Sequence, residues 1–98
     1  MEWKIRIHRK ALKFLEELPA EERKRVEDRL SDLLNSLKGG TLLHTRLDVR
    51  KLKGAWEGFL RLRVGKIRII FKIEIENKEV LVYNVHYRGQ AYRKSQRF

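Results

Sequence analysis

Two stretches of alternating apolar and basic residues, joined by a two-residue link, constrain the fold of this chain more than any other feature. Residues 59–64 read FLRLRV and residues 67–71 read IRIIF, with Gly65-Lys66 between them. A period of two predicts half-buried strands, and a short link containing glycine predicts a tight hairpin. In that hairpin Arg63 lies directly opposite Arg68. Like charges facing each other across a strand pair destabilise a sheet, so the pattern predicts a surface that presents its charges to an anion.

With this register, one face of the hairpin is apolar and the other is basic. The apolar face consists of Leu60, Leu62, Val64, Ile67, Ile69 and Phe71, and Ile73 and Ile75 are expected to continue it. The opposite face carries Arg61, Arg63, Arg68 and Lys72. Antiparallel sheets commonly pack one face on a core and leave the other in water. We therefore expect helices to cover the apolar face and the arginines to project away from them.

The N-terminal part of the chain predicts a strand followed by two helices. Residues 3–7 alternate between apolar and polar side chains, which is the strand period. Apolar residues at positions 11–18 follow helical spacing, and Pro19 ends or kinks this helix. Residues 26–37 carry an apolar stripe of the same spacing, which Gly39-Gly40 ends. The two helices should form a hairpin whose stripes face one core.

Three strands in an antiparallel meander are expected after the helices. They cover about residues 56–64, 67–76 and 79–88. Gly65-Lys66 and Asn77-Lys78 suit the tight turns between them, whereas residues 41–58 are less regular. The last strand begins with a run that is apolar on both faces, which predicts a central position. The expected fold is an α+β domain over residues 1–98, with both helices on one face of a single sheet.

The charge of the chain is concentrated in its second half. The net charge is +11, and residues 1–38 hold 10 basic and 8 acidic side chains, a net of +2. The remaining residues hold 14 basic and 5 acidic side chains, a net of +9. Such an excess suits a polyanionic partner, first of all nucleic acid. No apolar run reaches the ~18 residues of a membrane span, so no membrane partner is expected.

Other residue types exclude several kinds of site. The chain has no Cys, so it has no disulfide framework and no thiolate site, which fits a reducing cytosol. The three His and the acids show no metal-ligand spacing, so neither a metal nor a cofactor is expected. His8 and His44 lie far from the basic strands in this arrangement and are expected to be structural or exposed. Trp3 and Trp56 are expected in the core.

The basic face matches a phosphate chain. Arginine makes planar, bidentate contacts to phosphate and stays charged at any working pH. Further cations are expected to extend this face: Lys53, Lys66, Arg88, Arg93 and Lys94. Aromatic residues accompany them, and nucleobases stack on such rings in single-strand binders: Phe59, Tyr87 and Tyr92. A solvated sheet face is the simpler alternative, and the opposed arginines together with the charge of the second half favour RNA binding.

Three motifs carry a resemblance to a known family. They are the basic segment RKLKG at residues 50–54, the strand pair at 59–71, and HYRGQAYR at 86–93. In order and spacing the chain resembles RelE/ParE-superfamily toxins over nearly its whole length, and most of all archaeal RelE-type ribonucleases. An Arg four residues before a Tyr near the C-terminus recurs in this family, and Arg88 with Tyr92 matches it.

The resemblance implies a function and a set of site residues. It implies cleavage of messenger RNA in the ribosomal A site, in the cytoplasm, by the toxin of a type II toxin–antitoxin pair. It implies neutralisation by an acidic RelB-like antitoxin that folds as it wraps the domain. Position by position, the family's active-site residues fall on Arg61, Arg63, Arg68, Arg88 and Tyr92. Well-known bacterial members carry lysines where this chain has Arg61 and Arg63.

The chemistry implied is attack of a ribose 2′-OH on the adjacent phosphorus, without a metal ion. It gives a 2′,3′-cyclic phosphate and a free 5′-OH. Arg63, Arg68 and Arg88 would stabilise the charge that the phosphate gains, Arg61 would position the backbone, and Tyr92 would stack on a base or bind the phosphate. An arginine with a pKa above ~12 is no general base. His86 is the candidate for proton transfer, and Lys53 and Glu57 are weaker ones.

Two other functions fit the same residues. A ParE-like toxin would bind DNA gyrase and cut nothing, and a basic module would bind RNA without catalysis. The matching Arg68, Arg88 and Tyr92 favour the ribonuclease.

Overall fold

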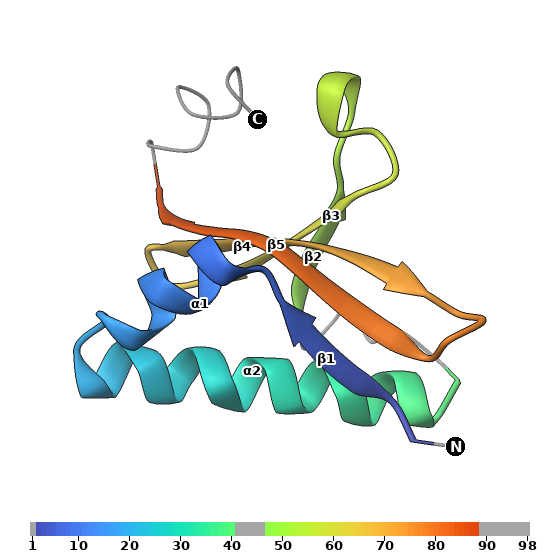
Figure 1. The fold of residues 1–98 in the computed structure, drawn as a ribbon, viewed down its shortest axis with the longest axis horizontal. Coiled ribbons are helices and arrows are strands. Elements are labelled where there is room, and N and C mark those ends of the chain that lie inside the picture. Colours follow the sequence, from blue (N-terminus) through green and yellow to red (C-terminus); the bar gives the residue numbers. More distant parts are fainter. Residues whose placement is uncertain (1, 41–46, 89–98) are drawn as a thin grey trace.

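Five strands form one sheet, and two helices lie against one of its faces in the computed structural model (Figure 1). The structure describes residues 2–40 and 47–88. The elements are β1 (Lys4–Ile7), α1 (Arg9–Glu16), α2 (Ala20–Lys38), β2 (Asp48–Lys51), the 3₁₀ turn η1 (Gly54–Trp56), β3 (Leu60–Val64), β4 (Ile67–Glu74) and β5 (Glu79–Tyr87). The predicted α+β fold, with its helical hairpin and C-terminal meander, is confirmed.

The order of the strands across the sheet is β1-β5-β4-β3-β2. β1 runs parallel to β5, and the other neighbours are antiparallel. β5 therefore has a partner on both sides, as its apolar faces predicted. β2 was not predicted, because it has four residues and buries only Val49, so it shows too little alternation. The strand expected from residue 56 begins at Leu60, because residues 54–56 form η1 instead.

The predicted β3–β4 register is confirmed. Val64 pairs with Ile67 and Arg63 with Arg68, across a turn in which Gly65 has φ +59°. That left-handed backbone strains residues with a Cβ, so glycine suits the turn. The β4–β5 register contains a bulge between Ile70 and Phe71, which pair with Asn84 and Val82 and leave Tyr83 outside the ladder. Strand pattern alone does not reveal such an insertion.

The core lies between the helices and the apolar face of the sheet. The sheet contributes Leu62, Val64, Ile67, Ile69, Phe71, Val80, Val82 and Val85, and the helices contribute Ala11, Leu15, Val26, Leu30 and Leu33. His8 is structural, as expected, because its Nδ1 accepts a hydrogen bond from the N–H of Lys10 at 3.2 Å and caps α1. Trp3 packs against this core, as expected, whereas His44 lies outside the described residues.

Two expectations for apolar residues were wrong. Trp56 does not join the core but contacts Phe59 edge to face, because η1 carries it out of the strand. Ile75 was expected to continue the apolar face of β4, yet its side chain is 75% exposed. β4 ends at Glu74, and the chain turns back with the N–H of Lys78 donating to the carbonyl of Ile75.

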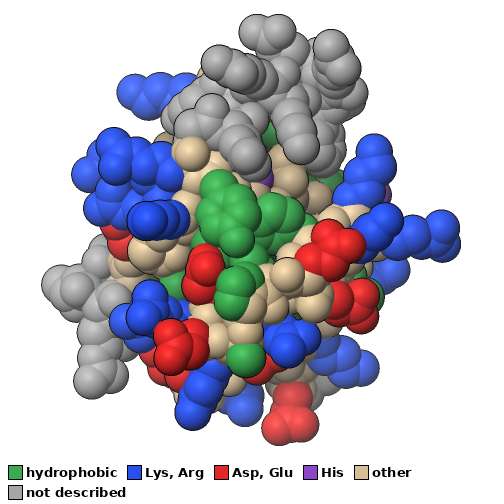
Figure 2. Space-filling view, turned by 90° about the vertical axis from the view of Figure 1, so that its left-hand side faces the viewer, with side chains coloured by type: hydrophobic (Ala, Val, Ile, Leu, Met, Phe, Trp, Pro, Cys, Tyr) green, Lys and Arg blue, Asp and Glu red, His purple; other side chains and the backbone are tan. Residues whose placement is uncertain are grey.

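The end of the molecule that carries the α1–α2 connection and the β3–β4 turn has a mixed surface. Figure 2 shows a hydrophobic patch there, with Lys and Arg side chains gathered on both sides of it. Two adjoining grooves at this end share Arg25, Val64 and Gly65 as lining residues. In the part of the chain that the structure describes, neither helix is long and apolar enough to cross a membrane.

The core predicts a large effect of truncating Leu62, whose side chain is 0% exposed beneath the helices. Leu62→Ala should lower the free energy of unfolding by roughly 2–5 kcal/mol, because it removes buried methyl groups and leaves a cavity. Ile75→Ala on the exposed turn is the control and should change it by less than about 0.5 kcal/mol. Urea titrations followed by tryptophan fluorescence measure both, and equal losses would contradict this account of the core.

Candidate functional site

The sheet face opposite the helices, called here the open face, carries two rows of paired, mostly polar residues that cross four strands. In the first row Asp48 pairs with Arg63, Arg63 with Arg68, and Arg68 with His86. Side chains of directly paired residues project to the same side of a sheet, so these four share one face. The second row, two residues further along each strand, consists of Arg50, Arg61, Ile70 and Asn84. Pairing across strands thus gathers residues from positions 48 to 86.

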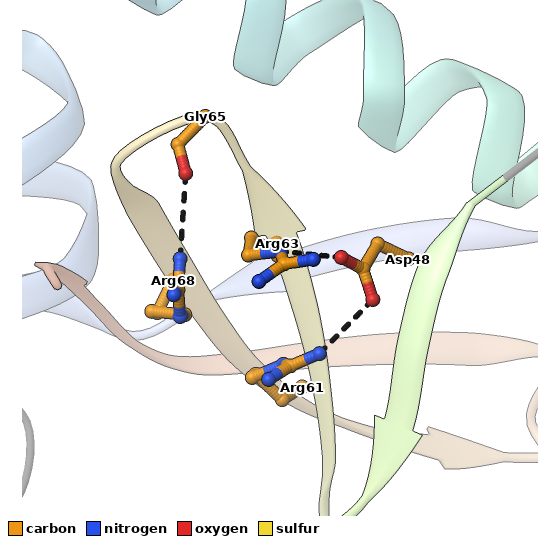
Figure 3. Close-up of polar contacts among 5 residues, drawn as sticks. All are labelled: Asp48, Arg61, Arg63, Gly65 and Arg68. Carbon is orange, nitrogen blue, oxygen red and sulfur yellow. Dashed lines mark hydrogen bonds and ion pairs between the residues drawn. The ribbon is translucent and has the colours of Figure 1, made fainter.

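One carboxylate holds two of the arginines. Asp48 Oδ1 accepts a hydrogen bond from a terminal nitrogen of Arg61 at 3.0 Å, and Asp48 Oδ2 pairs with Nε of Arg63 (Figure 3). Arg68 is turned toward the β3–β4 turn, where it donates to the carbonyl of Gly65 at 3.4 Å. The side chain of Arg61 is only 19% exposed, and its buried Nε has no hydrogen-bond partner within the described residues.

The cations around Arg68 repel it. Its pKa lies below the ordinary value of an arginine, first because of burial and then because of Arg61, Arg63 and Arg88, while Asp48 opposes the shift. An arginine nevertheless stays charged at neutral pH. Four guanidinium charges against one carboxylate leave this group, called here the arginine cluster (Asp48, Arg61, Arg63, Arg68 and Arg88), with a formal charge of +3. The predicted crowding of like charge is therefore present.

The other predicted residues lie around this cluster. The side chain of Arg88 is exposed, and its backbone N–H donates to the carbonyl of Lys66 at 2.7 Å, which ties the end of β5 to the β3–β4 turn. His86 is buried, with 4% of its surface exposed, and its strand pairing places it beside Arg68 on the open face. Lys53 is exposed just before η1, away from the paired rows. Tyr92, Arg93 and Lys94 lie outside the described residues.

Tyr87 and Lys72 do not lie beside the arginine cluster. Tyr87 was expected among the stacking aromatics, but it packs on the helix side against Phe14, at 5.2 Å between ring centroids. The alternation of β5 turns His86 to the open face and therefore Tyr87 away from it. Lys72 is on the open face as predicted, but its ammonium lies 5.8 Å from the ring centroid of Phe59, beyond the second row.

Three residues of the open face were missed in the sequence: Asp48, Arg50 and Asn84. Asp48 and Arg50 belong to β2, and only the pairing of β2 with β3 reveals that they join the arginines. Asn84 is half-buried opposite Ile70. Its presence in the middle of a strand, where Asn is disfavoured, was a weak signal. Among residues 2–40 and 47–88, no group of three or more His, Asp or Glu side chains is arranged to hold a metal ion.

Comparison with known proteins decides the family. A family model described as the ParE toxin of the type II toxin–antitoxin system parDE matches residues 5–92. The chain belongs to this toxin family. It is a RelE-like toxin, as the resemblance indicated.

Archaeal proteins resemble this toxin in sequence and fold. The protein named "Putative toxin RelE1" of Methanocaldococcus jannaschii is 27% identical over 93 residues, which cover 95% of this chain and 98% of the relative. A chain of the archaeal RelE-RelB complex from Pyrococcus horikoshii superposes with a TM-score of 0.73 at 25% identity, covering 92% of this toxin and 99% of that chain. A chain of the RelB-RelE complex from Methanococcus jannaschii gives 0.68 at 26% identity, covering 88% and 93%.

Burial of Arg68 and repulsion within the arginine cluster together predict that Arg68 opposes folding of the toxin. Because folding lowers the pKa of Arg68, its charged form is disfavoured in the folded state at every pH below that pKa, and the penalty disappears only at higher pH. Arg68→Met should therefore raise the free energy of unfolding at neutral pH by roughly 0.5 kcal/mol, the scale of opposed charges on a sheet. Urea titration measures the change.

Two variants and a salt series check this explanation. Lys72→Met, on the same strand and face, should give no gain, and Asp48→Asn should lower the free energy of unfolding because it removes the neutralising carboxylate. The gain from Arg68→Met should shrink in 1 M salt, where the screening length is about 3 Å. A gain that is independent of salt would point to burial of Arg68 or to side-chain packing instead of repulsion among the arginines.

Proposed function

We propose that this toxin is a ribosome-dependent endoribonuclease that cleaves messenger RNA in the A site. The observation that carries the proposal is the arginine cluster, where Asp48 pairs with Arg61 and Arg63 while Arg68 lies close enough to Arg61, Arg63 and Arg88 for their charges to lower its pKa. A phosphate that enters this cluster relieves the repulsion among the arginines. It gains more charge in the transition state of 2′-OH attack, so arginines fixed in advance stabilise that state more than the ground state.

Each arginine has a proposed role. Arg63, Arg68 and Arg88 stabilise the phosphate as a pentacoordinate phosphorane forms and the 5′-oxygen leaves. Arg61, held by Asp48 at 3.0 Å, positions the RNA backbone. Lys53, Lys66, Lys72, Arg93 and Lys94 contribute further contacts to the RNA, and Tyr92 contacts a base or the phosphate. Neither a metal ion nor an organic cofactor is needed for this reaction, because the nucleophile belongs to the substrate.

Proton transfer requires a residue other than arginine. His86 is the proposed one, because a neutral imidazole accepts a proton and it lies beside Arg68 in the first row. In this role it takes the proton of the 2′-OH or delivers one to the leaving 5′-oxygen. Its burial means that RNA must reach it from the open face, across the arginines.

The proposed partner in the cell is an acidic antitoxin. The two archaeal structures that resemble this toxin are complexes of RelE with RelB, which supports a RelB-like partner here. The net charge of +11 favours an acidic chain that folds along the toxin surface as it binds. Ribosome, message and antitoxin would all be met in the cytoplasm.

A second candidate function follows from the family description. The matching model is that of the ParE toxin. A ParE-like toxin would bind and inhibit DNA gyrase and would leave RNA intact. The arginine cluster favours the ribonuclease, since arginines gathered on one sheet face suit the phosphates of RNA.

An A-site cleavage assay with programmed ribosomes tests the proposal. The wild type should cut the codon in the A site and leave a cyclic phosphate. Arg68→Ala and Arg88→Ala should each lower the rate about 10²–10³-fold, as expected for loss of one transition-state donor. His86→Ala should lower it at least about 10²-fold if His86 transfers a proton. Lys38→Ala, which alters an exposed ion pair with Glu2 at the end of α2, is the control and should retain the wild-type rate.

The same preparation separates the candidate functions. Intact message together with inhibition of DNA supercoiling would establish the ParE-like alternative. RNA binding with a steep salt dependence and no product would establish a binding module.

Co-expression with the neighbouring reading frame tests the partner. We expect an acidic polypeptide that co-purifies with the toxin, abolishes cleavage, and gains secondary structure by circular dichroism when the two chains are mixed. A neutral, rigid globular partner, or an acidic chain that is already folded when free, would contradict this part of the proposal.

A further inference from the structure

A second group of side chains on the open face is aromatic. The ring of Phe59 contacts Trp56 at 5.3 Å with an interplanar angle of 88°, and Tyr83 at 4.9 Å with an angle of 80°. The three come from η1, the approach to β3, and β5, so residues distant in sequence meet here. Each is half-buried, and none belongs to the core under the helices. We call this group the aromatic cluster.

The aromatic cluster lies in line with the arginine cluster. Phe59 precedes Arg61 by two residues, and a strand rises about 3.3 Å per residue, so the two positions are roughly 7 Å apart along the backbone. Arg63 is about 13 Å from Phe59 on the same measure. A nucleobase attached to or next to a phosphate in the arginine cluster can span such distances. The bulge that leaves Tyr83 outside the ladder puts its ring against Phe59.

Charge around the aromatic cluster favours a nucleic acid over an apolar peptide. The ammonium of Lys72 lies 5.8 Å from the ring centroid of Phe59. Arg50 and Arg61 of the second row follow on the side of the arginine cluster. A ring bordered by cations suits a nucleotide, whose base stacks on the ring while its phosphate meets the cation.

We propose that Trp56, Phe59 and Tyr83 form a stacking subsite for one nucleobase of the RNA strand whose phosphate the arginine cluster holds. This inference rests on the proposed function. Stacking accepts every base because each has a π-face, so the subsite supplies affinity and fixes the strand without reading its sequence. With the arginines it defines the line that the RNA follows across the sheet, between the β3–β4 turn and the β2–β3 connection.

A fluorescence titration with RNA that the toxin does not cleave tests the subsite. In a Trp3→Phe background Trp56 is the only tryptophan, because the chain has two. The ligands are 2′-O-methyl dinucleotides, whose single phosphate fixes their register on the arginine cluster, with both bases present or with one of the two positions abasic. We expect intact RNA to quench Trp56 and one abasic position to remove most of the quenching. That position should also weaken binding about tenfold, the effect of losing roughly 1.4 kcal/mol of stacking.

Variants identify the ring that the base meets. Phe59→Leu and Tyr83→Leu keep apolar volume but remove a π-face, so each should weaken binding of intact RNA about tenfold. Neither variant should further weaken binding of the oligonucleotide whose missing base removes the quenching of Trp56. Tyr87→Leu is the matched control, because Tyr87 packs on the helix side, and it should leave RNA affinity unchanged.

Two results would overturn the subsite. Equal quenching and affinity at every abasic position is one, and quenching by an acidic peptide but not by RNA is the other, since it would make the cluster a protein contact. In either case the wild type would still cleave RNA in the A site, and Arg63→Ala would still weaken RNA binding. The proposed function would therefore stand. Loss of cleavage and of RNA binding in the wild type would instead remove both proposals.

Discussion

The pairing of β3 with β4 determines which side chains this toxin buries and which it presents. Strand side chains alternate, so a shift of one residue would send the arginines into the core and the leucines into water. The turn at Gly65 and the apolar residues Leu62, Ile69 and Phe71 oppose that shift together. The opposition of Arg63 and Arg68 follows from the same register, as an electrostatic cost that the buried apolar side chains offset.

Asp48 turns this cost into a defined geometry. A cluster of free arginines would spread into solvent, whereas here one carboxylate fixes Arg61 and Arg63 in orientation. Burial and the remaining formal charge of +3 both disfavour the charged form of Arg68 and lower its pKa. Under the proposed function, a phosphate would meet two guanidinium groups that Asp48 already holds in place. Sites of this kind commonly reduce stability in favour of function.

The sequence predicted the parts of this structure that depend on periodic patterns. The helices, the hairpin and its two faces follow from apolar spacing, which tertiary contacts reinforce. β2 and Asp48 could not be predicted, since their positions depend on pairing between segments with no pattern of their own. The bulge between Ile70 and Phe71 could not be predicted for the same reason. The contact of Tyr83 with Phe59, which depends on that bulge, was therefore not predicted either. Tyr87 was wrongly expected to stack on a base. Alternation along β5 puts Tyr87 on the side opposite His86, but only once the position of the strand in the sheet is known.

The hydrogen bond from Arg88 to Lys66 has a consequence for the end of the chain. It fixes the point where the polypeptide leaves the sheet next to the turn between β3 and β4. Arg88 itself lies one residue beyond β5, so its place depends on this single backbone bond and not on a strand ladder. The bond keeps the exposed guanidinium of Arg88 close enough to Arg68 to contribute to the lowered pKa of that residue. One backbone hydrogen bond thus adds a fourth cation to a group that strand pairing alone would leave with three.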